Sequence, residues 1–130
     1  MDDDSIISMV GQYFAKHAKG IVAVYVFGSV ARHGSKKTSD VDVAVLFAVS
    51  PPPTLAGLAL ATEADLEHLL GRPVDLVVLN GAPVDLIHRV LRDGALVLES
   101  DRAARVGFEV AARREYLDLL PVLRRYRKVA

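Results

Sequence analysis

The most informative part of this sequence is residues 27–45, which read FGSVARHGSKKTSDVDVAV. Gly28 and Ser29 follow an apolar, β-branched run, and ten residues then separate Ser29 from Asp40. Asp40 and Asp42 open a second β-branched run, and residues two apart on a strand point to the same face. The stretch therefore predicts a strand, a small polar turn, a loop and a second strand that presents two carboxylates together.

These two carboxylates repel each other and are costly to bury, so they require a counter-ion. A hard divalent cation such as Mg²⁺ suits a carboxylate pair combined with phosphate oxygens. Asp75 is well placed as a third ligand of a two-metal site, because its predicted strand otherwise holds only Pro, Val and Leu. At Gly28 the missing side chain lets phosphates approach, and backbone N–H groups and the Ser29 hydroxyl can bind them. Together these residues predict a site for metal ions and a nucleotide.

Each feature also has an ordinary explanation when it is taken alone. Asp40 could be a turn residue, Asp42 and Asp75 solvated strand residues, and the glycine and serine a strand-ending turn. Their order and spacing within one stretch favour the metal–nucleotide site.

The rest of the chain alternates helical and strand patterns. Helices are expected over residues 5–19, 54–70 and 84–92. Strands are expected over residues 21–27, 40–47, 73–79 and 95–98, with a short helical turn at 30–33 and a proline turn at 51–53. Asp101 begins a long C-terminal helix toward Tyr126, in which Pro121 predicts a kink or a second helix start. The pattern predicts an α/β domain, a mixed sheet of about four strands flanked by helices, with a possible hairpin between the first two.

Length and composition limit the classes of protein. A chain of 130 residues is the size of one domain, and 52% hydrophobic with 25% charged residues is a globular composition. With no cysteine, disulfides and thiolate chemistry are excluded, and the four dispersed histidines show no metal-ligand spacing. The acidic start and the lack of a long apolar run argue against a signal peptide and a membrane span. We therefore expect a single cytoplasmic domain over residues 1–130.

A net charge of +0 argues against nucleic acid as the main partner. The basic residues 124–128 are interpreted as a solvated helix end that suits the helix dipole, or as a contact to an acidic partner.

The spacing Gly-Ser, ten residues, Asp-x-Asp resembles the hallmark of the nucleotidyltransferase superfamily to which DNA polymerase β belongs. With so short a chain, it looks like the minimal nucleotidyltransferases (MNT), the antitoxin halves of HEPN/MNT toxin–antitoxin pairs. Family members usually carry Ala-Arg-Gly after Gly-Ser-x, whereas here His33 precedes Gly34 and the glycine comes one position late. The departure concerns the path of the loop and leaves every acidic residue in place.

The resemblance implies a polymerase β-like fold, ATP as substrate and two Mg²⁺ ions. Asp40 and Asp42 would coordinate both ions, and Asp75 would complete the ion site nearest the nucleophile. The acceptor would be a hydroxyl of the cognate HEPN toxin, a tyrosine above all, and transfer of AMP to it would silence the toxin's ribonuclease.

On the nucleotide side, the resemblance implies that Gly28 and Ser29 hold the β- and γ-phosphates. Arg32 is either a further phosphate contact or a solvated helix residue.

Larger nucleotidyltransferases add a domain that binds the acceptor, and a chain of this length does not accommodate one. A partner would then present the acceptor, and the C-terminal helix agrees with that. One stripe of this helix is apolar, and further apolar residues lie off it: Val106, Val110, Leu117 and Leu120 on the stripe, Phe108, Ala111 and Leu119 off it. A helix that is apolar on more than one face needs more than one neighbour. The core of the chain, a partner and a homodimer all stay open as explanations.

Two other functions also stay open. The chain could neutralise a toxin by stoichiometric binding alone, with a vestigial or structural motif. It could also modify a small molecule, as aminoglycoside nucleotidyltransferases do, with an acceptor pocket formed across a dimer.

Overall fold

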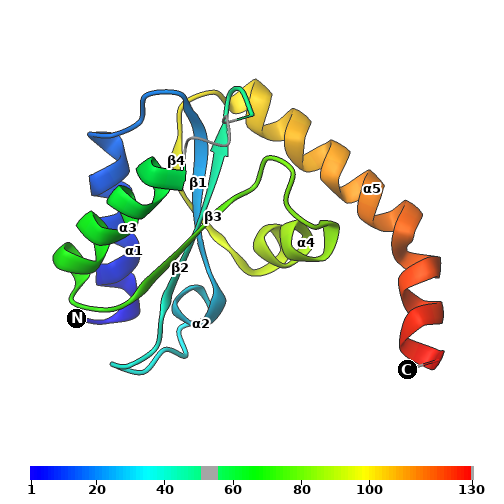
Figure 1. Cartoon of the computed structure of the whole chain (residues 1–130), viewed down its shortest axis with the longest axis horizontal. Helices are drawn as coiled ribbons and strands as arrows, with labels where there is room; N and C mark the ends of the chain where they lie inside the picture. The colour runs from blue at the N-terminus through cyan, green and yellow to red at the C-terminus, as the bar shows by residue number, and fades with distance from the viewer. Residues whose placement is uncertain (51–55, 130) are drawn as a thin grey trace.

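Within residues 1–50 and 56–129, which the computed structural model describes, four strands form one mixed sheet in the order β3-β2-β1-β4 (Figure 1). They are β1 (Ile21–Phe27), β2 (Val41–Phe47), β3 (Val74–Val78) and β4 (Ala95–Glu99). β1 pairs antiparallel with both β2 and β4, whereas β2 and β3 run parallel. The predicted mixed sheet and the predicted pairing of the first two strands are confirmed. The turn expected at residues 51–53 and the helix start expected at Thr54 lie outside the described residues.

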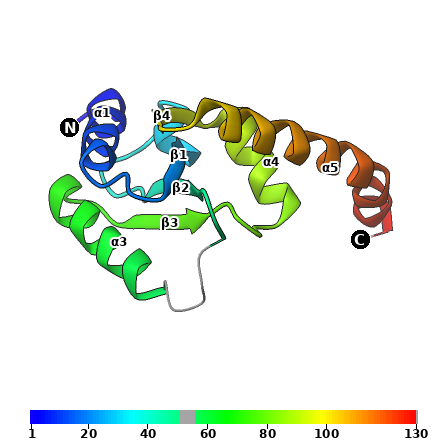
Figure 2. The ribbon, with the colours of Figure 1, turned by 90° about the horizontal axis from the view of Figure 1, so that it is seen from above.

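Five helices connect and cover these strands in the described part of the chain. They are α1 (Asp3–Ala15), α2 (Gly28–Ala31), α3 (Ala56–Leu70), α4 (Val84–Asp93) and α5 (Arg102–Val129). α1 and α3 cover one face of the sheet, and α4 with the first part of α5 covers the other (Figure 2). Among these residues no helix is both long and apolar enough to cross a membrane.

β1 shows why the sheet needs helices on both faces. Successive strand residues point to opposite faces, and β1 is apolar at every position. Val24 and Val26 pack with α1 and α3 in one core cluster, whereas Ala23 and Tyr25 pack with α4 in a second. An uninterrupted apolar strand of this kind is stable only when it is buried on both sides.

The ends of α1 differ from the predicted range. The helix begins at Asp3 because the Asp2 carboxylate accepts a hydrogen bond from the Ser5 amide at 2.8 Å and caps it. It ends at Ala15, four residues before the expected end, because the next two amides bond to carbonyls three residues back instead of four. The expected helix over residues 5–19 was therefore correct in type and wrong in its C-terminal boundary.

α5 is a single helix that begins after Asp101, whose carboxylate accepts from the Ala104 amide at 3.0 Å. Pro121 lies inside it, and Figure 1 shows the helix bending in its last third. The kink is therefore confirmed, and a second helix start at Pro121 is not found. Phe108 packs against the core of the second face, whereas Val106, Val110 and Leu117 stay 40%, 44% and 64% exposed. The chain's own core therefore does not cover the apolar stripe.

Candidate active site

The register of three strands brings the motif residues to one end of the sheet. Asp42 of β2 is paired with Asp75 of the parallel strand β3 and, on its other side, with Phe27 at the end of β1. Gly28 follows Phe27 directly. The glycine and the two aspartates therefore meet at this point.

β3 is an edge strand, and α3 holds it in place. Glu67 accepts a hydrogen bond from the Val74 amide at 3.0 Å, and Glu63 accepts one from the Leu76 amide at 2.9 Å. These two amides lie on either side of Asp75. The helix thus satisfies backbone donors that an edge strand leaves free, and it fixes the segment that carries the aspartate.

Gly28 is required for two reasons. Its φ is +74°, a left-handed conformation that costs other residues energy. A Cβ atom here would lie 2.1 Å from the Asp42 Oδ2 atom, closer than atoms can approach. The backbone at the start of α2 therefore lies directly against the Asp42 carboxylate. The approach of phosphates to Gly28 stays a prediction.

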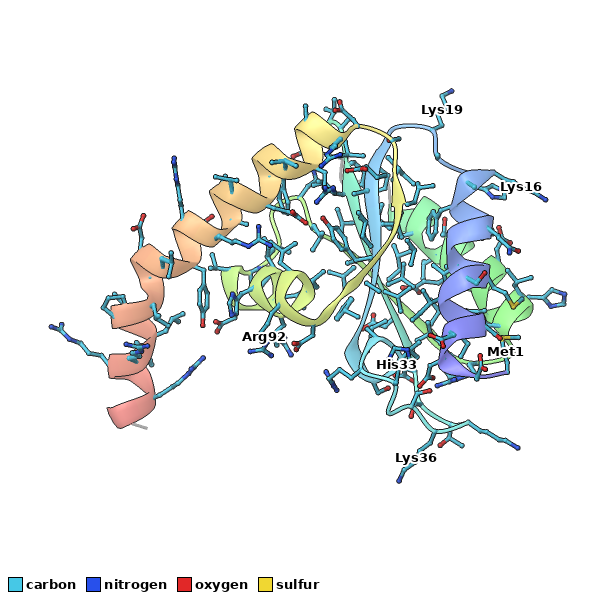
Figure 3. The ribbon with its side chains drawn as sticks, turned by 180° about the vertical axis from the view of Figure 1, so that it is seen from behind. Met1, Lys16, Lys19, His33, Lys36 and Arg92 are labelled. Carbon is cyan, nitrogen blue, oxygen red and sulfur yellow. The ribbon has the colours of Figure 1, made fainter. Side chains whose placement is uncertain are left out.

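A cleft of about 510 Å³ opens over this end of the sheet. It is lined by Phe27, Gly28, Ser29, Arg32, Asp42, Asp75, Val77, Leu86, Arg89, Arg92 and Asp93. Five of the six predicted site residues therefore come together in one cleft. Arg32, directly after α2, and two arginines of α4 line the cleft together with the aspartates of the strands, and Figure 3 shows Arg92 at the end of α4. Such a cleft combines positive groups for phosphates with carboxylates for a cation.

Asp42 carries the most perturbed carboxyl group of the cleft. Burial raises its pKa first, and the neighbouring carboxylates of Asp75 and Asp40 raise it further. Arg32 and Arg89 oppose this shift without cancelling it. The negative charge of Asp42 is therefore costly in the protein alone, and a bound cation would relieve that cost.

Asp40 differs from the other two aspartates. It is exposed, lies one residue before β2 and directly after the turn at residues 36–39, and is not among the residues that line the cleft. The expectation that the second strand begins at Asp40 was therefore wrong by one residue. In the part of the chain that the structure describes, no three His, Asp or Glu side chains lie close enough to hold a metal ion by themselves.

This donor set fits Mg²⁺ held together with a substrate. Mg²⁺ is usually bound by one or two carboxylates, several waters and substrate phosphates, and not by a cage of protein ligands alone. The paired carboxylates of Asp42 and Asp75, with Asp40 close enough to influence Asp42, correspond to that arrangement.

Arg89 and Arg92 are cleft residues that the sequence analysis missed. They are three residues apart on α4 and therefore share a helix face. The signal that could have revealed them is this spacing on the helix that directly follows the strand of Asp75. Arg32, for which two explanations were open, lines the cleft while remaining exposed.

The loop between α2 and β2 is tied to the start of α1. Asp3 accepts hydrogen bonds from the backbone and the hydroxyl of Ser35, and Asp4 Oδ1 lies 2.8 Å from His33 Nε2. His33 has a φ of +58°, and it occupies the position where the family pattern carries glycine. Although the glycine is displaced by one position, the backbone at position 33 still has the left-handed conformation. Histidine adopts it there, beside two acidic residues.

Residues 10–103 match the family model described as polymerase beta, nucleotidyltransferase. The chain belongs to this nucleotidyltransferase family. A protein of Methanocaldococcus jannaschii that is named as a protein adenylyltransferase is 34% identical over 79 residues, which are 61% of this chain and 82% of that protein. A solved minimal nucleotidyltransferase is 37% identical with a TM-score of 0.54, and the alignment covers 73% of this chain and 95% of that one.

Solved toxin–antitoxin complexes share the fold of this nucleotidyltransferase over nearly its whole length. A chain of a complex with AMP-PNP aligns at 22% identity with a TM-score of 0.77, covering 98% of this chain and 97% of that one. A chain of the Shewanella oneidensis complex of tri-AMPylated HEPN toxin with MNT antitoxin aligns at 20% identity with a TM-score of 0.73, covering 97% and 96%. The predicted polymerase β-like fold with a long C-terminal helix is confirmed.

Proposed function

We propose that this nucleotidyltransferase is the antitoxin of a HEPN/MNT pair and transfers AMP from ATP to a tyrosine hydroxyl of its cognate HEPN toxin. The observation that carries the proposal is the contact of the Gly28 backbone with the Asp42 carboxylate, beside Asp75 on the next strand. This arrangement supports a phosphate site at Gly28 directly beside a cation site at Asp42 and Asp75.

The residues of the cleft divide into two groups in this proposal. Gly28 and Ser29 hold the β- and γ-phosphates, and Arg32 balances their charge. Asp42 and Asp75, with Asp40 at the rim, would hold two Mg²⁺ ions. Mg²⁺ bound there would neutralise the carboxylates and polarise the α-phosphate.

The transfer itself is an in-line displacement at the α-phosphorus. The acceptor hydroxyl releases its proton to solvent, and its oxygen forms a bond to this phosphorus while the bond to the bridging oxygen of the β-phosphate breaks and pyrophosphate leaves. Charge develops on the leaving group during this step. Arg89 and Arg92 of α4 line the same cleft as the aspartates, and in this proposal they stabilise that charge.

Three observations support a protein acceptor. The Methanocaldococcus jannaschii relative is named as a protein adenylyltransferase. The solved complexes with the same fold contain a toxin and an antitoxin, and one of these toxins is AMPylated. The exposed apolar stripe of α5, defined by Val106, Val110 and Leu117, offers a surface for a partner.

The test is to incubate the protein with its cognate toxin, Mg²⁺ and ATP labelled at the α-phosphate. We expect the label to appear on the toxin, and Asp42→Asn or Asp75→Asn to reduce the initial rate by about 100-fold or more. Asp118→Asn, at an exposed acidic residue of α5, serves as the matched control and should label at the wild-type rate.

Unchanged labelling in the double variant Asp40→Asn/Asp42→Asn would contradict the mechanism. The same variants also distinguish catalysis from stoichiometric binding. If Asp42→Asn abolishes labelling but still protects cells from the toxin, neutralisation is by binding.

A further inference from the structure

A second cavity, of about 310 Å³, lies between α4 and α5. It is lined by His88, Leu91, Arg92, Arg113, Tyr116 and Leu117. Arg92 lines both this cavity and the cleft of the aspartates, so the two spaces adjoin at this residue. None of the other five residues is used by the proposed transfer.

The cavity contains a preformed aromatic pair. The rings of His88 on α4 and Tyr116 on α5 are stacked, with centroids 3.6 Å apart and planes at 2°. Each helix thereby fixes the ring of the other. Rings held in this way offer flat faces at little cost in conformational freedom, which is what a planar base requires.

The cavity also contains a second arginine, Arg113, whose guanidinium can donate hydrogen bonds to a ligand. Arg92 donates two hydrogen bonds to Asp93, at 3.1 Å and 2.8 Å. The guanidinium of Arg113 lies 3.8 Å from Glu109, beyond hydrogen-bond distance, and its side chain is 54% exposed. A guanidinium is a planar, bidentate partner for a phosphate.

These observations select a ligand that has a planar ring and a phosphate of its own. The triphosphate of the substrate is accounted for by Gly28 and Ser29 in the cleft, so it does not explain Arg113. We propose that the α4–α5 cavity is a second nucleotide site, which binds a purine nucleoside 5′-monophosphate with its base at Tyr116 and its phosphate at Arg113. Because the cavity adjoins the cleft, the AMP group already joined to the acceptor is its ligand, and the site retains the modified partner. The exclusion of the substrate triphosphate and this origin of the AMP group rest on the proposed function, whereas the cavity, its stacked rings and Arg113 do not.

The first experiment measures binding of free AMP by calorimetry in EDTA, which removes Mg²⁺. We expect AMP to bind the wild-type protein, and both Tyr116→Leu and Arg113→Gln to weaken the affinity by about tenfold or more. Arg114→Gln is the matched control, since Arg114 is exposed and adjacent on α5 but does not line the cavity. Arg113→Gln changes a surface residue and keeps the test valid if Tyr116→Leu lowers the melting temperature.

The second experiment distinguishes the α4–α5 cavity from the nucleotide site of the cleft. AMP-PNP with Mg²⁺ should bind Tyr116→Leu and Arg113→Gln within about twofold of wild type. An equal loss of AMP-PNP affinity would overturn the proposal, because the cavity would then hold the base of the incoming nucleotide. Absence of AMP binding at millimolar concentration would also overturn it.

The third experiment tests the origin of the AMP group with N-acetyltyrosinamide that carries AMP on its phenol oxygen. This ester should bind at least as tightly as free AMP and lose affinity in the same two variants. Binding of free AMP with exclusion of the ester would overturn the assignment to a modified acceptor. Binding of AMP is measured without any transfer step, so a failure of the proposed transfer does not affect this result. Asp42→Asn should accordingly leave AMP binding unchanged.

Discussion

Gly28 lets the backbone lie against the Asp42 carboxylate, so a substitution there should change both the stability of the protein and its activity. In Gly28→Ala the new Cβ would overlap the Asp42 carboxylate and the left-handed φ would be strained. We expect a loss of about 1–2 kcal/mol in the free energy of unfolding from the strained backbone alone. Nucleotidyl transfer should also fall by about 100-fold or more, because the carboxylate must move. Urea unfolding and the labelling assay measure the two effects.

The control for this substitution is Gly34→Ala, in the following loop. Gly34 has no positive φ, and nothing lies within 4 Å of a Cβ placed there. Its stability should match that of wild type or slightly exceed it. Wild-type behaviour of Gly28→Ala would show that the contact with Asp42 is not needed.

Asp42 leads to a prediction about pH and Mg²⁺. Its pKa in the folded protein is raised above the ordinary 3.8, so the folded state is penalised once the carboxyl ionises. Without Mg²⁺, Asp42→Asn should therefore melt at a higher temperature than wild type at pH 7. The difference should shrink as the pH falls through the raised pKa and vanish below pH 3.8.

Mg²⁺ provides the second arm of this experiment. A cation that binds the folded state stabilises it, so added Mg²⁺ should raise the melting temperature of wild type and leave that of Asp42→Asn nearly unchanged. Melting curves measured with EDTA and with Mg²⁺ at several pH values test both statements. Equal stabilisation of the two proteins by Mg²⁺ would show that Asp42 is not a ligand.

Between elements, the start of α1 restrains the loop that joins the two halves of the motif. Asp4 bonds to His33, and this hydrogen bond raises the pKa of the imidazole above 6.5, with further contributions from the charges of the neighbouring aspartates. The interaction therefore stabilises the loop at pH values below 6.5 and is lost as the pH rises through the raised pKa. In Asp4→Asn the pKa of His33 should fall toward 6.5. NMR titration of the imidazole protons measures this shift. An unchanged His33 titration in the variant would mean that the loop is not held by Asp4 in solution.

For the molecule as a whole, the sequence was sufficient for the elements and for five of the eleven residues that line the cleft. Apolar runs and glycine stops specified the strands and helices, because burial and backbone freedom act locally along the chain. The meeting of Asp42 with Asp75 depends on the register of two parallel strands, which local patterns do not specify. Arg89 and Arg92 reach the cleft through the packing of α4, and Asp40 lies one residue before the strand and is not among the residues that line the cleft.

The position of α5 relative to the sheet depends on one polar network. The Tyr25 hydroxyl on β1 donates to Glu109 at 2.8 Å, and Arg105 donates both to Glu109 at 2.8 Å and to Glu99 of β4 at 2.6 Å. Glu109 is only 14% exposed, so the network is largely shielded from water. Burial, followed by the bond to Glu109, raises the pKa of Tyr25, which therefore stays protonated as a donor.

Glu109→Ala should therefore affect both stability and function. It leaves the Tyr25 hydroxyl and one Arg105 donor without their acceptor, and we expect a loss of about 1–3 kcal/mol in the free energy of unfolding. Because α5 also carries Tyr116 and Arg113, AMP binding should weaken, whereas AMP-PNP binding in the cleft should persist. Glu115→Ala, at an exposed position of the same helix, should leave all three measurements at wild-type values. Wild-type stability of Glu109→Ala would show that the network is not needed and that apolar packing, including that of Phe108, holds α5 on the sheet.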